Sequence, residues 1–404
     1  IPESQLHCTM TVAVLIDADL YEYDLDSLCH TYGLGRKIEL PSKKNMADLP
    51  FEIVEQYASM DALLTLKLHL WQQEEIIRQG IQDIVDFEHE VLPRICRANY
   101  EGIRVDLDLA QRAMIDLTPI IDDNQKKLNE LCGWAMNVNS PPQVKKLLKP
   151  KKMTLPGGEE VWATEDGTIL ESTDSGGASI GAEALRRIKH PAAQLILETR
   201  SLLKTRDTFL KKHILEHAVG NRVYPTINQN RGEEGGTVTG RLSYVDPALQ
   251  QIPSRNKKVA AIVKACFLPD EGQVCVDNDM ASFEVRVFAH LANNPRIKQA
   301  YAENPELDFH QFVADVTGLV RNATYSGQPN AKQLNLSMIF NSGNGAIAEE
   351  MGMPWAWDSF IAKDSGRLIS YKRAGDEAMA VINHYHNTLP GIKELAQRAK
   401  NLAE

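Results

Sequence analysis

Several features that would place a protein in a familiar class are missing from this 404-residue sequence. No apolar run approaches the roughly 20 residues that a membrane-spanning helix needs, so we expect no membrane contact. The six cysteines are scattered and form no CxxC pair, which argues against a zinc site and favours a reducing compartment such as the cytoplasm. The chain begins at Ile1 without the charged and apolar regions of a signal peptide, so we expect a fragment whose start lies upstream.

The net charge of −10 argues weakly against a polyanionic partner, but the charge is unevenly distributed. Residues 186–264 hold 15 basic and 6 acidic side chains, a local +9 that leaves −19 for the rest. A basic tract in an acidic protein is typical of a nucleic-acid contact, although a solvated basic surface is the commoner explanation.

Hydrophobic periodicity predicts an α+β protein without internal repeats. Helical patterns dominate up to about residue 215 and return after 291. Between them, "NRVYPTINQN" and "GQVCVDNDM" predict short strands separated by loops rich in Gly and Pro. We therefore expect helical domains arranged around a small sheet, with divisions near residues 80, 215 and 290.

The stretch "DNDMASFEVRVFAHL" (277–291) places charged residues in an apolar run. The preceding pattern predicts a strand carrying Val274 and Val276, with Asp279 at its end. A carboxylate there suits Mg²⁺, which takes oxygen ligands and substrate phosphates. The alternative is a helix-capping Asp followed by Glu284 in the first helical turn. The following pattern predicts a helix with one face formed by Phe283, Val287 and Leu291.

Three stretches resemble, in the right order, the motifs of family A DNA polymerases. They are "TVTGRLSYVDPALQQIPSR" (237–255), "DMASFEVRVFAHL" for motif A and "NAKQLNLSMIFN" (330–341) for motif B. Weaker similarity runs through "NVNSPPQVKKLL", "YEGIRVDLDLA" and "YASMDALLTLKLH". The resemblance implies a right-hand polymerase fold with a thumb, a partial palm, fingers and a remnant of an RNase H-like 3′-5′ exonuclease domain. The implied domains are 1–80 (C-terminal part of the exonuclease-like domain), 81–215 (thumb and connecting helices), 216–290 (first part of the palm) and 291–404 (fingers).

The resemblance also implies roles for the charges of motif A. Asp279 matches the catalytic aspartate that binds both Mg²⁺ ions, with the backbone carbonyl of Met280 as a further ligand. Glu284 matches the glutamate that excludes a ribose 2′-hydroxyl by steric clash. Arg286 is expected to be a structural partner of palm carboxylates.

Motif B places Lys332, Leu336 and Phe340 at i, i+4 and i+8, on one helix face. The resemblance implies that Lys332 binds the triphosphate and acts in catalysis, and that Leu336 and Phe340 form an apolar platform for the nucleotide. His310, in "ELDFHQF", matches an element that contacts a phosphate. Ordinary core packing with a surface lysine is the alternative for this stripe of residues.

Two departures from the family pattern concern the same motif. Gln328 stands where the family usually has Arg, so nucleotide affinity falls unless another cation such as Arg321 compensates. Leu336, with Phe340 and Asn341, resembles phage and viral members.

The DNA contacts implied by the resemblance lie mostly in the basic tract. Arg241 matches the arginine that probes the minor groove at the primer end, where the acceptors are shared by all correct base pairs. The template signature is matched by Gln250, Gln251 and Arg255, and a helix following primer phosphates by Arg200 and Lys204. The thumb tip would carry Lys145, Lys146, Lys149, Lys151 and Lys152.

Both ends of the sequence lack family motifs. Tyr57 and Asp61 fit the third exonuclease motif, but the first two motifs should lie upstream, so we do not expect proofreading by this chain. Motif C, a hairpin carrying H-D-E, is missing. Asp376 and Glu377 precede a helical pattern, and we interpret them as first-turn helix acids.

The predicted function is template-directed addition of deoxynucleotides to a DNA primer, in replication or repair, with two Mg²⁺ ions in the complete enzyme. The expected partners are primer-template DNA and deoxynucleoside triphosphates, and the expected location is the cytoplasm of a bacterial cell or phage-infected host. One alternative is a noncatalytic DNA-binding polymerase fragment. A single-subunit RNA polymerase is a further alternative, which Glu284 disfavours.

Overall fold

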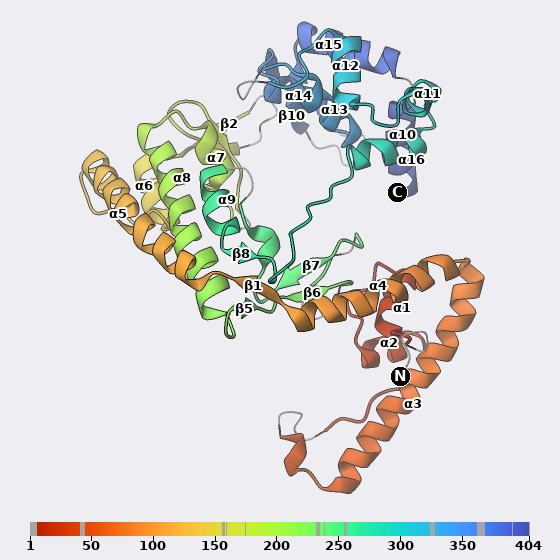
Figure 1. The fold of residues 1–404 in the computed structure, drawn as a ribbon. Coiled ribbons are helices and arrows are strands. Elements are labelled where there is room, and N and C mark those ends of the chain that lie inside the picture. The colour runs from red at the N-terminus through yellow and green to blue at the C-terminus, as the bar shows by residue number, and fades with distance from the viewer. Residues whose placement is uncertain are drawn as a thin grey trace. The chain divides into compact units, whose positions relative to one another are not determined.

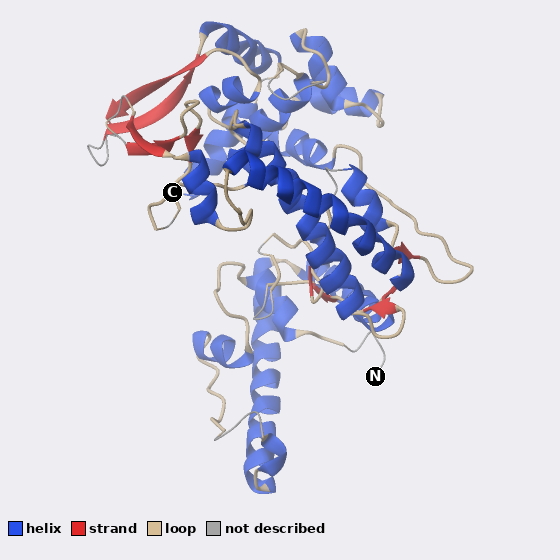
Figure 2. Ribbon diagram, turned by 90° about the vertical axis from the view of Figure 1, so that its left-hand side faces the viewer, coloured by secondary structure: helices blue, strands red, loops and turns tan. Residues whose placement is uncertain are grey.

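The structure is a computed structural model that describes residues 6–40, 45–155, 158, 160–173, 175–231, 235–237, 239–253, 257–323, 328–361, 368–389 and 391–403. The chain divides into two compact units, Ile1–Asn139 with Gln194–Cys275 and Ser140–Ala193 with Val276–Glu404. Helices dominate the described residues and most strands are short, as Figures 1 and 2 show, which confirms the predicted α+β class.

Helices form most of the first unit. The 29-residue helix α3 ends at Gly80, whose φ of 67° is a left-handed conformation that glycine adopts at no steric cost. In α5 the Asp106 carboxylate caps the first turn by accepting the Leu109 N–H at 2.8 Å. The elements are α1 (Thr9–Ile16), α2 (Leu25–Thr31), the 3₁₀ turn η2 (Met46–Asp48), α3 (Phe51–Gln79), α4 (Gln82–Glu101), α5 (Leu107–Cys132), α8 (Pro191–Leu203, which begins in the second unit), the π-helical η3 (Lys204–Glu216), the 3₁₀ turn η4 (Leu249–Gln251) and α9 (Lys257–Lys264).

A three-stranded antiparallel sheet in the order β5-β1-β8 lies at the core of this unit. Val105 of β1 and Val223 of β5 are buried among apolar residues of α5, η3 and α9. Gly102 joins α4 to β1, and a Cβ atom there would lie 2.7 Å from the Val223 carbonyl oxygen, so only glycine fits. The strands are β1 (Ile103–Val105), β5 (Arg222–Val223), β8 (Phe267–Leu268) and the separate pair β6 (Thr226–Asn228) and β7 (Ser243–Val245).

The second unit contains a small segment from residues 140–193 and the helical region from 276 onward. The first has helices α6 (Pro141–Leu148) and α7 (Ala182–Arg187) and the antiparallel strands β2 (Lys151–Thr154), β3 (Glu160–Ala163) and β4 (Ile169–Leu170). The second has helices α10 (Phe283–Ala292), α11 (Pro295–Glu303), α12 (Phe309–Thr317), α13 (Ala331–Ile339), α14 (Asn344–Glu350), α15 (Asp376–Thr388) and α16 (Ile392–Ala403).

One continuous apolar core joins these C-terminal helices. Phe309 of α12, Leu334 of α13 and Tyr385 of α15 are almost fully buried in it. Between α14 and α15 the chain forms a hairpin of β9 (Trp355–Ile361) and β10 (Leu368–Ala374). Asp376 and Glu377 lie in the first turn of α15, as predicted.

The predicted strand "GQVCVDNDM" is wrong. Among the described residues none pairs with it, and all side chains of residues 271–280 are exposed, Val274 at 81% and Val276 at 83%. The helix after it forms, but it buries Val285 and Ala289 and leaves the predicted apolar face exposed. The strand fails because a buried strand needs pairing partners, and the described residues supply none.

The four-domain division remains a prediction. The end of α3 coincides with the first boundary, whereas the other two fall within η3 and α10. None of the described helices is long and apolar enough to cross a membrane.

Candidate functional site

Asp308 caps the N-terminus of α12 and also binds Arg321. The Asp308 carboxylate accepts the N–H groups of His310 and Gln311 at 3.1 and 3.2 Å and the Arg321 Nε at 2.6 Å. Partial burial opposes ionisation of Asp308, but these donors hold the pKa of its carboxyl below the ordinary value. Arg321 is therefore fixed beside the N-terminal turn of α12.

A buried polar network connects α12, α13 and α15. The Asn335 side chain is fully buried, and its Oδ1 accepts the Tyr385 hydroxyl at 2.8 Å. Its Nδ2 lies 3.2 Å from Nδ1 of His310, so donation there leaves the proton of a neutral imidazole on Nε2. Burial, followed by the nearby Lys332 charge, lowers the pKa of His310. His310 therefore lies within reach of the Lys332 charge, and its lowered pKa favours the neutral imidazole near pH 7.

The motif B stripe faces solvent. Asn330 caps α13 by accepting the Gln333 N–H at 2.9 Å, which places Lys332 in the first turn with its side chain exposed. Leu336 is half-buried, and Phe340, just past the helix end, is 69% exposed. The opposite face of α13 supplies the core. Ordinary core packing therefore does not explain the stripe, which is available to a ligand.

Arg286 is held by backbone carbonyls and an aromatic ring, which corrects its expected pairing with carboxylates. Its guanidinium donates to the carbonyls of Ala281 and Pro305 and lies 4.6 Å from the ring centroid of Tyr301. These contacts tie the start of α10 to the loop after α11. Glu284, in the first turn of α10, is exposed.

Asp279 and Met280 lie in the exposed segment before α10, so Asp279 does not end a strand. Asp279 and the Met280 carbonyl are oxygen ligands of the kind that Mg²⁺ prefers, and their exposure leaves room for phosphate and water oxygens. Within the described ranges, no group of three or more His, Cys, Asp or Glu side chains could hold a metal. These residues fit one Mg²⁺ shared with a substrate phosphate, and a second ion needs another carboxylate.

Gln328 is exposed just before α13, and its carbonyl accepts the Asn330 side chain at 2.9 Å. Arg321, the candidate for compensation, lies close by, because its carbonyl accepts the Lys332 N–H at 3.0 Å.

The implied DNA contacts lie in the first unit. Arg241 is exposed, and its carbonyl accepts the Thr237 hydroxyl at 2.7 Å. Gln250 and Gln251 are exposed in η4, and Gln250 donates to the Leu242 carbonyl at 2.7 Å. Arg255 lies outside the described residues.

Arg200 and Lys204 differ in exposure. Lys204 is exposed at the start of η3 and stays a candidate phosphate contact. Arg200 is half-buried, donates its Nε to the Val138 carbonyl at 2.7 Å, and has its pKa lowered by burial. The Nε of Arg200 therefore takes part in an intramolecular hydrogen bond that links α8 to the residues after α5.

The thumb-tip lysines lie in the 140–193 segment. Lys145 is half-buried, and Lys152 pairs with Glu160 at 2.6 Å across β2 and β3. Lys146, Lys149 and Lys151 are exposed.

The structure brings Tyr57 and Asp61 together around a residue that sequence reasoning missed. Lys37 Nζ lies 2.7 Å from Asp61 Oδ2 and 5.1 Å from the ring centroid of Tyr57. Burial opposes the charge of Lys37, but its contacts with Asp61 and Tyr57 raise its pKa overall. The Lys37 ammonium group therefore balances the charge of the Asp61 carboxylate.

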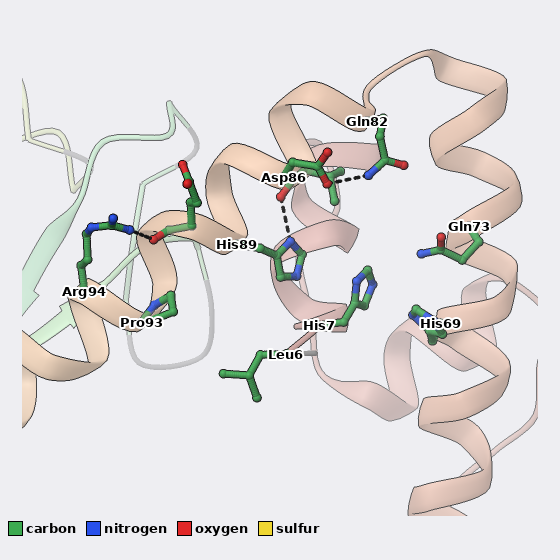
Figure 3. Close-up of a pocket in the computed structure, with 11 residues that line it drawn as sticks. Leu6, His7, His69, Gln73, Gln82, Asp86, His89, Pro93 and Arg94 are labelled. Carbon is green, nitrogen blue, oxygen red and sulfur yellow. Dashed lines mark hydrogen bonds between the residues drawn. The ribbon is translucent and has the colours of Figure 1, made fainter. Parts of the chain in front are cut away.

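A cavity of about 630 Å³ in the first unit contains three histidines (Figure 3). The His7 ring stacks on His89 at 4.7 Å between centroids and meets His69 edge-on at 4.3 Å. His89 has a defined role, because its Nε2 accepts the Cys8 N–H and its Nδ1 contacts the Val85 carbonyl. Burial and the neighbouring histidines lower the pKa of His7 to about 4. This cluster packs the N-terminal segment against α3 and α4.

A family model described as DNA polymerase family A matches residues 108–404. The chain belongs to this family. It is 52% identical to the DNA polymerase DpoZ of Vibrio phage phiVC8, over 96% of this chain and 61% of that protein. It is 26% identical to DNA polymerase I of Pseudomonas aeruginosa, over 97% of this chain and 40% of that protein. The higher identity to the phage enzyme confirms the prediction of a phage-like member.

Among solved structures, the chain is similar to the POL domain of Pol1 from M. smegmatis, in a complex with DNA primer-template and dNTP. The TM-score is 0.70 at 19% identity, and the match covers 98% of this chain and 61% of that one. This likeness confirms the family A polymerase fold. The chain spans less than two thirds of the length of the curated phage relatives.

Sequence reasoning also missed Asn335 and Tyr385. A signal was present, because Asn335 is a polar residue between the apolar Leu334 and Leu336 of a predicted helix. Its partners on α12 and α15 could not be identified from sequence spacing.

Proposed function

We propose that this chain is the template-directed DNA-synthesising part of a phage-like family A polymerase, which adds deoxynucleotides to a primer in replication or repair. The observation that carries the proposal is the stripe of exposed Lys332, half-buried Leu336 and exposed Phe340 along α13 and its C-terminal end, near the buried His310 with its lowered pKa. A cation followed by a half-buried and an exposed apolar side chain matches a nucleoside triphosphate, which has a charged end and a flat base.

The α13 residues act on the phosphates and the base in different ways. Lys332 balances charge on the transferring phosphoryl group, and the N-terminal turn of α13 adds its helix dipole. His310 presents its Nε2–H as a neutral donor, and Arg321 supplies the second fixed charge that Gln328 lacks. Leu336 and Phe340 support the base and sugar.

Asp279 and the Met280 carbonyl would hold Mg²⁺, which would supply positive charge to the substrate phosphates. Family A polymerases generally use a divalent metal, and the complete enzyme would use two ions. Glu284 occupies the space beneath the sugar and rejects ribonucleotides, which disfavours the RNA polymerase alternative.

Primer-template DNA is the proposed partner, contacted by Arg241, Gln250, Gln251, Arg255 and Lys204, with Arg200 shaping the surface. These contacts are with the backbone and the minor groove, so binding should weaken with salt and vary little with sequence. The proposed location is the cytoplasm of a bacterial cell or a phage-infected host.

Primer extension with Mg²⁺ tests the proposal when the chain is compared with Asp279→Ala and the matched control Asp277→Ala. Both aspartates are exposed in the same segment. We expect Asp279→Ala to lose at least about 1,000-fold in rate, because a metal ligand is removed, whereas Asp277→Ala retains activity. Equal loss in both variants contradicts the assignment of Asp279.

Lys332→Ala tests the nucleotide site, with Lys298→Ala on α11 as its control. We expect KM for deoxynucleotides to rise about 10- to 100-fold in Lys332→Ala only, the effect of losing one charge-assisted contact. Salt-sensitive binding of primed DNA without any extension would instead favour a noncatalytic DNA-binding fragment.

A further inference from the structure

The β9-β10 hairpin has two different faces. Seven antiparallel pairs, from Leu368 opposite Ile361 to Ala374 opposite Trp355, fix its register. Because side chains alternate along a strand, Trp355, Trp357 and Lys372 share one face. The other face carries Phe360 and Ile369 as one pair, Asp358 and Tyr371 as the next, and Ala356 and Arg373 as the last.

The first face is fixed against the helical core. Lys372 forms an ion pair with Glu349 of α14 and lies 5.0 Å and 5.7 Å from the rings of Trp355 and Trp357. A Cβ atom on Gly345 of α14 would lie 2.0 Å from the Lys372 carbonyl oxygen, so helix and strand are in direct backbone contact. The hairpin is therefore held rigidly by α14.

The second face is exposed and aromatic. Phe360 is 50% exposed, and its ring meets that of Tyr371 at 5.7 Å between centroids, with the planes 70° apart. Arg373 reaches Asp358 at 3.4 Å, but both side chains are well exposed, and such pairs contribute little and exchange partners readily. This face thus combines two aromatic rings, an aliphatic side chain and an exchangeable arginine.

A cavity of about 480 Å³ lies where β10 meets the start of α14. It is lined by residues 371–374 of β10, by Gly343, Asn344 and Ala346, and by Met379 of α15. Gly343 follows Phe340, at the end of the nucleotide platform, by three residues. Their Cα atoms are therefore at most about 11 Å apart. The aromatic face, the cavity and the platform form neighbouring parts of one unit.

We propose that the outer face of the β9-β10 hairpin binds the unpaired template strand beyond the primer end. This inference rests on the proposed polymerase function. Single-stranded nucleic acid is recognised by aromatic rings that stack on bases and by basic groups that contact phosphates. Phe360 and Tyr371 supply the rings and Arg373 the cation.

The charge of the hairpin favours a nucleic acid, rather than a second copy of this chain, as its binding partner. Residues 355–374 hold four basic and two acidic side chains, in a chain whose net charge is −10. Arg373 gains a phosphate oxygen in place of a weak surface pair with Asp358, and the bases cover the exposed rings of Phe360 and Tyr371.

Equilibrium binding of primer-template DNA tests the inference, with a template overhang of about 10 nucleotides compared with one of about 2, lengths that bracket a typical single-strand site. We expect the long overhang to bind more tightly. The double variant Phe360→Ala with Tyr371→Ala should lose about 10-fold in affinity for the long overhang and little for the short one. Phe360→Tyr with Tyr371→Phe, which keeps both rings, should retain the affinity.

Ile361→Ala is the matched control, because Ile361 is 67% exposed on the opposite face of the same strand. The inference is overturned if the variant without the two rings binds both overhangs as tightly as the unaltered chain, or if Ile361→Ala loses as much affinity for the long overhang. It is also overturned if sedimentation shows that the unaltered chain is a dimer and that removing the two rings makes it a monomer. Failure of every variant to bind primed DNA of either length would instead contradict the proposed function.

Discussion

The region where α12 meets α13 and the segment 271–280 both carry proposed catalytic groups, yet they differ in how those groups are held. Asn335 lies fully buried between His310 and the Tyr385 hydroxyl, and Arg321 is bonded to Asp308. In the segment, every side chain is exposed and no described residue pairs with the backbone as a strand. The proposed phosphate-binding groups are thus preorganised, whereas the proposed metal ligand Asp279 is not.

From this difference we expect the proposed nucleotide site to form within a single helical core and the proposed metal site to need further contacts. Helices satisfy their own backbone hydrogen bonds, so α12 and α13 need only an apolar face to pack. An isolated extended segment leaves its backbone groups to water. We therefore expect ligand binding to change the order of residues 271–280 more than that of α13.

The largest expected effect is on hydrogen exchange. Amides in the middle of α13 should exchange at least about 1,000-fold more slowly than those of residues 274–280, because exchange in a packed helix requires opening of the core. Mass spectrometry of the chain at neutral pH measures both. Similar protection in the two regions would show that the segment is paired in solution and would remove the contrast.

Asn335→Ala should destabilise the second unit by about 3 kcal/mol, since it leaves a cavity and two buried polar partners, His310 and Tyr385, without a hydrogen bond. Asp279→Ala should change the unfolding free energy by less than about 0.5 kcal/mol. Denaturant unfolding measures both. A comparable loss in Asp279→Ala would mean that Asp279 has a structural partner.

A smaller effect should follow from pH. His310 has a lowered pKa in the fold, so the unfolded state takes up more protons as pH falls below about 6.5, the ordinary value for histidine. The stability of the second unit should therefore decrease below that pH. Protonated His310 is repelled by Lys332 and Arg321 and attracted by Asp308, and the lowered pKa shows that burial and repulsion outweigh the attraction. Hydrogen exchange of α13 amides, measured at several pH values, reports on the second unit alone, whereas His7, whose pKa is also lowered, lies in the first unit. The variant His310→Gln should make the stability of the second unit depend less on pH.

Local sequence predicted much of the helical structure and the spacing that puts the motif B residues on one side of a helix. The spacing of Lys332, Leu336 and Phe340 depends only on helix geometry, and the acids Asp376 and Glu377 lie where their helix begins. The strand at Val274 and Val276 was wrong because β-propensity measures fitness for a paired and half-buried surface, and pairing is not encoded locally. The DNA contact expected of Arg200 stays a prediction, and nothing in the sequence indicated that its Nε donates to the Val138 carbonyl, 62 residues away in the chain.

The sequence by itself determined the family, through motifs whose order and spacing are properties of the chain alone. Only the tertiary structure decided which polar groups meet. Lys37 with Asp61, Asn335 with Tyr385 and Lys372 with Glu349 join residues 24, 50 and 23 positions apart. Such pairings follow from how apolar faces pack in three dimensions, because burial brings distant segments together and forces each buried polar group to find a partner.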